Sequence, residues 1–186
     1  MSTVREARLP DDKPAILEFI MALQRYESFL ESNRRFDLAM AEEYFATLVE
    51  RARRGRIVIA DDERGRPIGW AIVYEEETEA FITADERRFA YLAELFVTEG
   101  HRGTGTAYRL IDACEEWARA AGYATMRIDL LARNERAARA YAKAGYEPYC
   151  QEVKKRLLPA RAEAASAEAT VLPFRTARRL PLSAAE

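Results

Sequence analysis

The chain has 186 residues, which is enough for one domain with a substantial apolar core. A hydrophobic fraction of 49%, a charged fraction of 32% and a net charge of −2 are those of an ordinary globular protein and give no strong field that would attract nucleic acid. Two cysteines and one histidine exclude a disulfide framework and a histidine-rich zinc site, so we expect no nucleic-acid partner and no metal.

The N-terminal part of the chain is predicted to form a strand and two helices. Residues 1–12 lack the apolar core of a secretory signal, and no run in the chain reaches the length of a transmembrane helix. We therefore expect a cytoplasmic protein without a membrane partner. Alternating residues predict a strand over 3–9. Apolar spacing predicts helices over 10–30 and 38–54, the second ended by Gly55.

The middle of the chain alternates between strands and helices. Apolar runs predict a hairpin of strands 56–60 and 68–75, and then, after an acidic segment, a longer strand over 89–97. The remaining patterns predict a helix over 107–122, a strand over 123–132, a helix over 134–145, and a last strand or hairpin over 146–158. This order predicts an α/β (α+β) fold with a mixed, mostly antiparallel central sheet and flanking helices.

The composition changes at about Pro159. Alanine, arginine and proline dominate residues 159–186 without a sustained period, so we expect a flexible or loosely docked tail. Only four of the 29 basic residues in the whole chain are lysine, and this bias is typical of a GC-rich bacterial genome.

Glycines gather where the predicted strand 89–97 leads into the predicted helix 107–122. The segment 102–107 reads Arg-Gly-Thr-Gly-Thr-Ala, and its small residues allow a ligand to approach the backbone. The first amides of a helix are unpaired and lie at the positive end of its dipole, so a pyrophosphate fits there. A plain tight turn is the alternative, because short Gly-x-Gly patterns are common.

Two segments resemble the signatures of the GNAT family of N-acetyltransferases. The first signature is Arg or Gln, two residues, Gly, one residue, then Gly or Ala, and it is filled by Arg102, Gly105 and Ala107. The second is Asn-x-x-Ala followed by Tyr-x-Lys-x-Gly-Phe/Tyr, and it is filled by Asn134, Ala137, Tyr141, Lys143, Gly145 and Tyr146. The resemblance covers about residues 3–158 and is strongest over 92–146.

The resemblance implies a GNAT domain over 1–158, with acetyl-CoA as the acetyl donor. In the family, the strand that here ends at Val97 separates from the next strand. The pantetheine arm of the donor lies in the gap, and its diphosphate lies at the glycine segment. The implied cofactor-binding residues are Leu95, Phe96, Val97, Arg102, Gly103, Thr104, Gly105, Thr106, Ala107, Tyr108, Asn134, Ala137 and Tyr141.

Acetyl transfer to an amine requires a base for the ammonium proton and an acid for the departing sulfur. By the resemblance, Tyr141 is the general acid, although an aromatic residue there could simply pack the helix onto the sheet. Glu94 and Asp129 are the candidate bases, with Glu94 preferred and with Tyr91 and Glu27 as unranked alternatives. A strand face that is open to solvent would also explain a carboxylate in this strand. Asn134 could contact the cofactor, act as a helix N-cap, or do both.

The acceptor is expected to be a small primary amine. The acidic segment 75–86 could attract a cationic amine such as an aminoglycoside or a polyamine, or it could be an ordinary solvated loop. A protein N-terminus or lysine as acceptor and a non-catalytic acetyl-CoA-binding module are the competing hypotheses. A homodimer is among the assemblies that the sequence allows.

Overall fold

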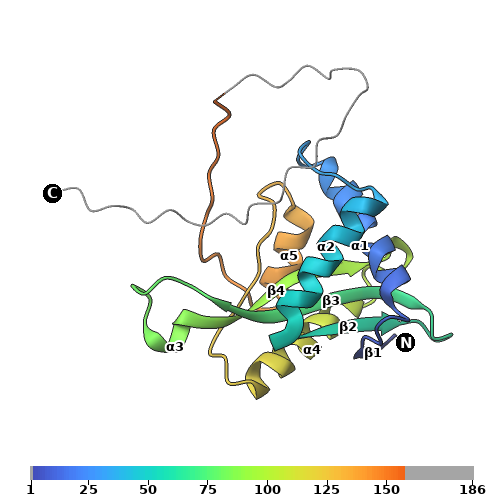
Figure 1. The fold of residues 1–186 in the computed structure, drawn as a ribbon, viewed down its shortest axis with the longest axis horizontal. Helices are drawn as coiled ribbons and strands as arrows, with labels where there is room; N and C mark the ends of the chain where they lie inside the picture. Colours follow the sequence, from blue (N-terminus) through green and yellow to red (C-terminus); the bar gives the residue numbers. More distant parts are fainter. Residues whose placement is uncertain (1, 158–186) are drawn as a thin grey trace. The chain divides into compact units, whose positions relative to one another are not determined.

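The computed structural model describes residues 2–157 (Figure 1). By its internal contacts the chain divides into two units, residues 1–147 and 148–186. The elements of the first unit, in chain order, are β1 (Thr3–Glu6), α1 (Lys13–Ser28), α2 (Leu38–Arg51), η1 (Ala52–Arg54), β2 (Gly55–Asp61), β3 (Pro67–Glu77), α3 (Ala84–Arg87), β4 (Arg88–Val97), η2 (Glu99–His101), α4 (Thr106–Ala120), β5 (Met126–Arg127) and α5 (Glu135–Lys143).

The strands form one five-stranded sheet in the order β1-β2-β3-β4-β5. The first three pairings are antiparallel, and β5 lies parallel to β4 after the crossover through α4. The predicted mixed, mostly antiparallel sheet is therefore confirmed.

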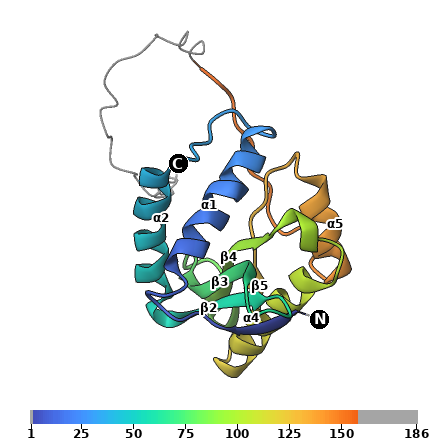
Figure 2. The same cartoon turned by 90° about the vertical axis from the view of Figure 1, so that its right-hand side faces the viewer.

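Helices cover both faces of the sheet (Figures 1 and 2). On one face, α1 and α2 pack against the alternate residues Ile57 and Ile59 of β2, and on the other face α4 packs against Val58 and Ala60. Because both faces are buried, β2 and β3 read as nearly continuous apolar runs rather than as polar–apolar alternation.

A β-bulge in β4 changes which side chains face which layer. Ile72 pairs with Glu94 and Val73 with Leu92, so Ala93 is an extra residue in β4. Such a bulge shifts the alternation of side chains by one position. Leu92 before the bulge and Leu95 after it both pack on the α4 side, so Glu94 faces α1 and α2.

The C-terminal strands differ from the prediction. The strand expected over 123–132 is limited to Met126–Arg127, and the strand or hairpin expected over 146–158 is wrong, because residues 147–157 form neither helix nor strand. Pro148 lacks the N–H that a ladder needs, and the basic residues at 154–156 interrupt the alternation. The predicted tail over 159–186 lies outside the described residues. Within residues 2–157, no helix has the length and apolar character needed to cross a bilayer.

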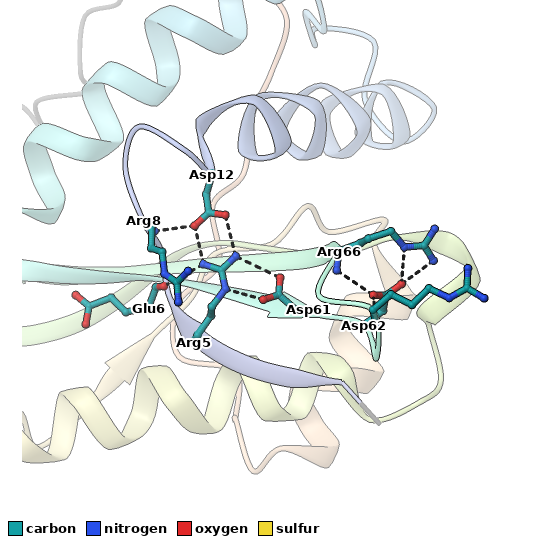
Figure 3. A network of polar contacts seen from close by, with 8 residues as sticks. Arg5, Glu6, Arg8, Asp12, Asp61, Asp62 and Arg66 are labelled. Carbon is teal, nitrogen blue, oxygen red and sulfur yellow. Dashed lines mark hydrogen bonds and ion pairs between the residues drawn. The ribbon is translucent and has the colours of Figure 1, made fainter.

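A buried ion-pair network joins the beginning of the sheet to α1. Figure 3 shows the Arg5 guanidinium from β1 between two carboxylates, with Nε at 2.6 Å from Asp61 Oδ2 and Nη1 at 2.7 Å from Asp12 Oδ2. The two aspartate side chains are 8–9% exposed. The hydrogen bond from Arg5 holds the pKa of Asp12 below its ordinary value. This network fixes the entry into α1.

Candidate functional site

The last strands of the sheet separate shortly after they pair. β4 and β5 pair through Ala90↔Met126 and Tyr91↔Arg127, and the rest of β4, up to Val97, lies beyond this ladder. Thr98 N donates to Ile68 O at 2.8 Å, and successive residues of a strand direct their amides to opposite sides. The amides and carbonyls of Leu95 and Val97 therefore point away from β3, toward the gap.

A cavity of about 530 Å³ lies at this gap. Its wall comes from α1, the α1–α2 loop, α2, β4, the glycine segment, the chain after β5, and α5. The lining residues are Leu23, Gln24, Tyr26, Glu27, Arg34, Tyr44, Ala93, Glu94, Leu95, Phe96, Val97, His101, Arg102, Gly103, Gly105, Ala107, Tyr108, Ile128, Asp129, Leu130, Asn134, Arg136, Ala137, Arg139, Ala140, Tyr141 and Lys143.

The predicted site residues line this cavity, with two exceptions. Thr104 and Thr106 are absent from the wall. The Thr106 side chain is buried, and its hydroxyl lies 2.9 Å from Thr104 Oγ1 and 3.0 Å from Ser2 Oγ. The buried Thr106 side chain therefore supports the segment from behind, whereas Thr104 is exposed and its hydroxyl also donates to His101 O at 2.7 Å.

The glycine segment forms the turn that starts α4. Gly103 and Gly105 have φ values of 77° and 81°, a region that residues with a Cβ rarely adopt. A Cβ at Gly103 would meet nothing within 4 Å, so the backbone conformation, and not crowding, requires glycine there. Arg109 N makes the first bond of the helix, to Gly105 O, so the amides before it have no acceptor within α4.

The Arg102 side chain contacts the end of β4. Its Nε donates to Val97 O at 3.0 Å, and its guanidinium lies 5.8 Å from the centre of the Phe96 ring. One of the carbonyls that was expected to pair with the pantetheine arm therefore already has a protein partner, whereas the Leu95 backbone faces the gap without this constraint.

Two carboxylates lie at the α1–α2 end of the cavity. Glu94 is 7% exposed and accepts a hydrogen bond of 2.6 Å from the Tyr44 hydroxyl of α2. Burial raises the pKa of Glu94 to about 7, and the nearby Glu27 adds to this rise; the Tyr44 hydrogen bond and Arg34 oppose it. Burial also raises the pKa of Glu27, against the lowering effect of Arg34.

Tyr141 lies on the α5 side of the cavity. Burial, together with the charges of Glu94 and Glu27, raises the pKa of its phenol, so the hydroxyl stays protonated at neutral pH. Its ring also contacts Tyr146, at 6.0 Å between centroids. The packing role considered for this tyrosine and a role in the cavity are therefore compatible.

Asp129 and Asn134 have different surroundings from Glu94. Asp129 is exposed and accepts a hydrogen bond of 3.1 Å from the Tyr91 hydroxyl. Asn134 is the N-cap of α5: its Oδ1 accepts from Ala137 N at 3.2 Å and from the Tyr26 hydroxyl at 3.3 Å. The capping interpretation of Asn134 is confirmed, and its side-chain amide nitrogen remains for a ligand.

The acidic segment does not line the cavity. None of its carboxylates belongs to the wall, and its first two pair with arginines, Glu75 with Arg54 at 3.0 Å and Glu76 with Arg51 at 3.7 Å. The hypothesis that this segment attracts a cationic acceptor into the site is not supported.

Several residues of the cavity wall had no signal in the sequence, and three of these contact candidate site residues. Tyr44, Arg34 and Tyr26 lie on α2, on the α1–α2 loop and on α1, in parts of the chain without a recognisable motif. Their contacts with Glu94, Glu27 and Asn134 show that they belong to the site. Tyr44 and Tyr26 contact residues 50 and 108 positions away, so these two pairings arise from the fold.

Comparisons with known proteins agree with this geometry. Residues 19–146, more than half of the chain, match the model of the acetyltransferase (GNAT) family. A comparison with curated protein sequences finds no match.

Several solved structures share the fold. A mutant of the BH1408 protein from Bacillus halodurans superposes with a TM-score of 0.73 at 19% identity, over 84% of this chain and 99% of that chain. The aminoglycoside 6'-N-acetyltransferase from Acinetobacter haemolyticus gives 0.63 at 15% identity, over 83% and 97%. The glucosamine-6-phosphate N-acetyltransferase of Arabidopsis thaliana gives 0.59 at 13% identity, over 84% and 99%.

At these identities the structural likeness shows the fold, and the family match shows the class of enzyme. The signatures, the separated strands and the match over residues 19–146 converge, and the chain belongs to the GNAT family of acetyltransferases.

Proposed function

We propose that this enzyme transfers the acetyl group of acetyl-CoA directly to the primary amino group of a small cationic amine. The observation that carries this proposal is the position of Glu94. A buried carboxylate whose pKa is raised to about 7 lines the same cavity as the protonated phenol of Tyr141. This is a base and an acid at one site.

The residues present fit the donor that the family uses. Unbonded amides at the start of α4 and the positive end of its dipole suit a diphosphate. Arg102, Arg136 and Lys143 line the cavity and add positive charge. The outward backbone of Leu95 and the chain after β5 offer hydrogen-bonding groups to the pantetheine arm.

The roles of the chain's residues follow from their surroundings. Acetyl-CoA, when bound, supplies an activated acetyl thioester. Glu94 removes a proton from the acceptor ammonium, either directly or through water, which frees the nitrogen lone pair for attack. Tyr141 would donate its phenolic proton to the sulfur that leaves as the C–S bond breaks, and the second proton lost from nitrogen as the amide forms would restore the phenol. Tyr44 holds the Glu94 carboxylate in position through the 2.6 Å hydrogen bond.

The size and the walls of the cavity support a small acceptor. Its volume of about 530 Å³ is shared between the donor arm and the acceptor. Tyr26 of α1 reaches across to α5, where its hydroxyl bonds Asn134 and its ring lies 4.6 Å from the Arg136 guanidinium. This bridge limits the space that a protein segment would need.

The test is a screen of amines with detection of the free CoA thiol. The panel contains short monoamines, polyamines, aminoglycosides, and peptides that offer an N-terminus or a lysine. Thiol release that is fastest with a small amine, and that yields the N-acetylated product, is the expected result. Release with peptides alone would replace the proposed acceptor class, and release with no amine would contradict the proposed reaction.

A further inference from the structure

We propose that Arg34 restricts the acceptor to amines that carry a single ammonium group in the inner cavity. Arg34 forms an ion pair with Glu27, the second carboxylate there, and so makes Glu27 unavailable to a second ammonium group. This inference rests on the proposed function of the cavity and assigns a selectivity role to a residue of the α1–α2 loop.

The contact between Arg34 and Glu27 is an ion pair within the cavity wall. Arg34 Nε lies 3.2 Å from Glu27 Oε2, and the two side chains are 31% and 17% exposed. The Nε atom is buried, and its N–H makes no well-aligned hydrogen bond with any described residue. The two side chains are therefore held together by charge, and Arg34 presents a positive group to the acceptor end.

One further cation would balance the charges at this end of the cavity. When both are ionised, Glu94 and Glu27 contribute two negative charges, and Arg34 cancels one of them. Four uncharged polar residues also line the cavity: Tyr44 from α2, Tyr26 and Gln24 from α1, and Tyr141 from α5. A single ammonium at Glu94 thus completes the balance of charge.

A second ammonium on the same acceptor would meet the guanidinium. To reach Glu27 it would have to displace Arg34 and leave that charge without its partner in a partly buried site, which is unfavourable. Arg34 therefore acts against dications in particular, whereas it leaves the binding of a monocation to Glu94 unopposed.

The test compares two amines on the same enzyme. The amines are a short α,ω-diamine and the n-alkyl monoamine with the same number of carbons, and the measured quantity is the ratio of their kcat/KM values. We expect the wild-type enzyme to prefer the monoamine. In Arg34→Gln, Glu27 becomes free for the second ammonium, and the ratio should move toward the diamine by at least about tenfold, which corresponds to about 1.4 kcal/mol.

Matched variants separate the effect of the Arg34 charge from a general loss of activity. Arg34→Lys keeps the positive charge and should keep the preference of the wild type. Arg35→Gln alters the neighbouring arginine, which is exposed and paired with Asp37 outside the cavity wall, and should leave the ratio unchanged. Loss of overall activity in a variant does not affect the comparison, because both amines are measured on the same preparation.

The outcomes distinguish this inference from the function on which it rests. If Arg34→Gln leaves the ratio unchanged, or if the wild type already prefers the diamine, the role of Arg34 is wrong while the acetyltransferase reaction stands. If the wild type acetylates no amine in the screen, the proposed function itself is wrong.

Discussion

Glu94 shows how one side chain is adapted by its position. An exposed glutamate is fully ionised at neutral pH and is a weak base. Burial against α1 and α2, with Glu27 nearby, raises the Glu94 pKa to about 7, so the carboxylate can accept a proton at working pH and release it afterward. The same rise has a cost, because the folded state then disfavours the ionised form.

Glu94→Gln should therefore remove the base. We expect kcat to fall by about 10²–10⁴-fold, the usual contribution of a general base. In the wild type, kcat/KM should rise with pH through about 7 as Glu94 ionises, and this limb should disappear in the variant. Glu42→Gln, at an exposed position of α2, is the control. A pH profile that Glu94→Gln leaves unchanged would assign the base to another group.

The stability of the fold should depend on Glu94 in the opposite sense. Its folded pKa of about 7 is above the ordinary value of about 4.3, so the folded state binds more protons between these two values. Its contribution to the free energy of unfolding is therefore fully present below about pH 4.3 and decreases as the pH rises to about 7. Denaturant titrations of wild type and Glu94→Gln across this interval measure it.

Tyr141→Phe should separate catalysis from binding. Loss of the hydroxyl removes the proton donor while the ring still packs on Tyr146. We expect kcat to fall at least about tenfold, with the increase in melting temperature caused by acetyl-CoA retained. Tyr146→Phe is the matched control, since its hydroxyl bonds Glu115 away from the cavity. Equal turnover in both variants would exclude Tyr141 from proton transfer.

Single residues differ in how far the sequence could reveal them. Glu94 stands out as a charge within an apolar strand, and Tyr141 matches a family signature, so both could be predicted. Tyr44 and Arg34 could not, because Tyr44 contacts Glu94, 50 positions away, and Arg34 lies in a loop without a motif. Asn134 was ambiguous in the sequence because capping and ligand contact require the same residue type.

At the scale of elements, the start of α4 and the end of β4 determine the site. The positive φ values of Gly103 and Gly105 turn the chain so that the first amides of α4 have no acceptor within the helix. The extra residue Ala93 turns Glu94 toward α1 and α2. Two local backbone features thus position both the proposed donor site and the proposed base.

Gly105→Asp should abolish stabilisation by acetyl-CoA. A carboxylate at this position repels the diphosphate and blocks access to the helix amides. At 100 times Kd a ligand contributes about 2.7 kcal/mol, which is roughly 5–10 °C in melting temperature for a chain of this size. The variant should lose this shift in a thermal scan with and without the ligand.

Gly65→Asp is the matched control for backbone strain. Gly65 also has a positive φ, of 73°, but it lies in the β2–β3 turn outside the cavity wall. Both variants should have a lower melting temperature without ligand, and Gly65→Asp should keep the full shift. A full shift in Gly105→Asp would place the diphosphate elsewhere.

Elements with a strong pattern were predicted better than those without one. Helices α1, α2 and α4 have apolar periods and β2 to β4 have apolar runs, and the burial of these elements agrees with both patterns. The bulge at Ala93 has no signal in the sequence, since "YLAELFV" is consistent with regular alternation. β5 ends at Arg127 and is therefore shorter than predicted. The apolar residues that follow it, Ile128 and Leu130, line the cavity and do not pair with β4.

At the scale of the first unit, residues 1–147, the ion-pair network of Arg5 contributes stability far from the catalytic residues. One guanidinium joins β1 to the end of β2 and to the residue before α1 (Figure 3). Its carboxylate partners Asp12 and Asp61 are buried, so removing Arg5 leaves both without their shared cation. The sequence did not predict this network, because Asp61 is 56 positions from Arg5 and only the pairing of β1 with β2 brings them together.

Arg5→Met should lower the free energy of unfolding by about 2–4 kcal/mol at pH 7, somewhat less than for a fully buried pair because the Arg5 side chain is 26% exposed. The lowered pKa of Asp12 contributes stability that is present above the ordinary value of about 3.9 and is lost as the pH falls through the folded pKa. The difference between variant and wild type should therefore shrink below about pH 4 in urea titrations.

Arg66→Met is the comparison for the Arg5 variant. Arg66 pairs with Asp62 at 2.7 Å but is 66% exposed, and exposed pairs contribute little. Its midpoint in urea should stay close to that of the wild type. Equal effects of the two substitutions would mean that burial of the Arg5 network does not contribute to stability.

The short ladder between β4 and β5 has an effect on how the enzyme behaves between turnovers. The ladder has two residue pairs, so the backbone of β4 after Tyr91 and the chain after Arg127 are not paired with each other. With acetyl-CoA bound as proposed, the donor lies between the two strands and makes contacts with both that replace the missing strand pairing. After each product release, the backbone amides of the segment 128–130 should exchange hydrogen faster again. The enzyme is then most rigid with its substrate bound and more flexible without it.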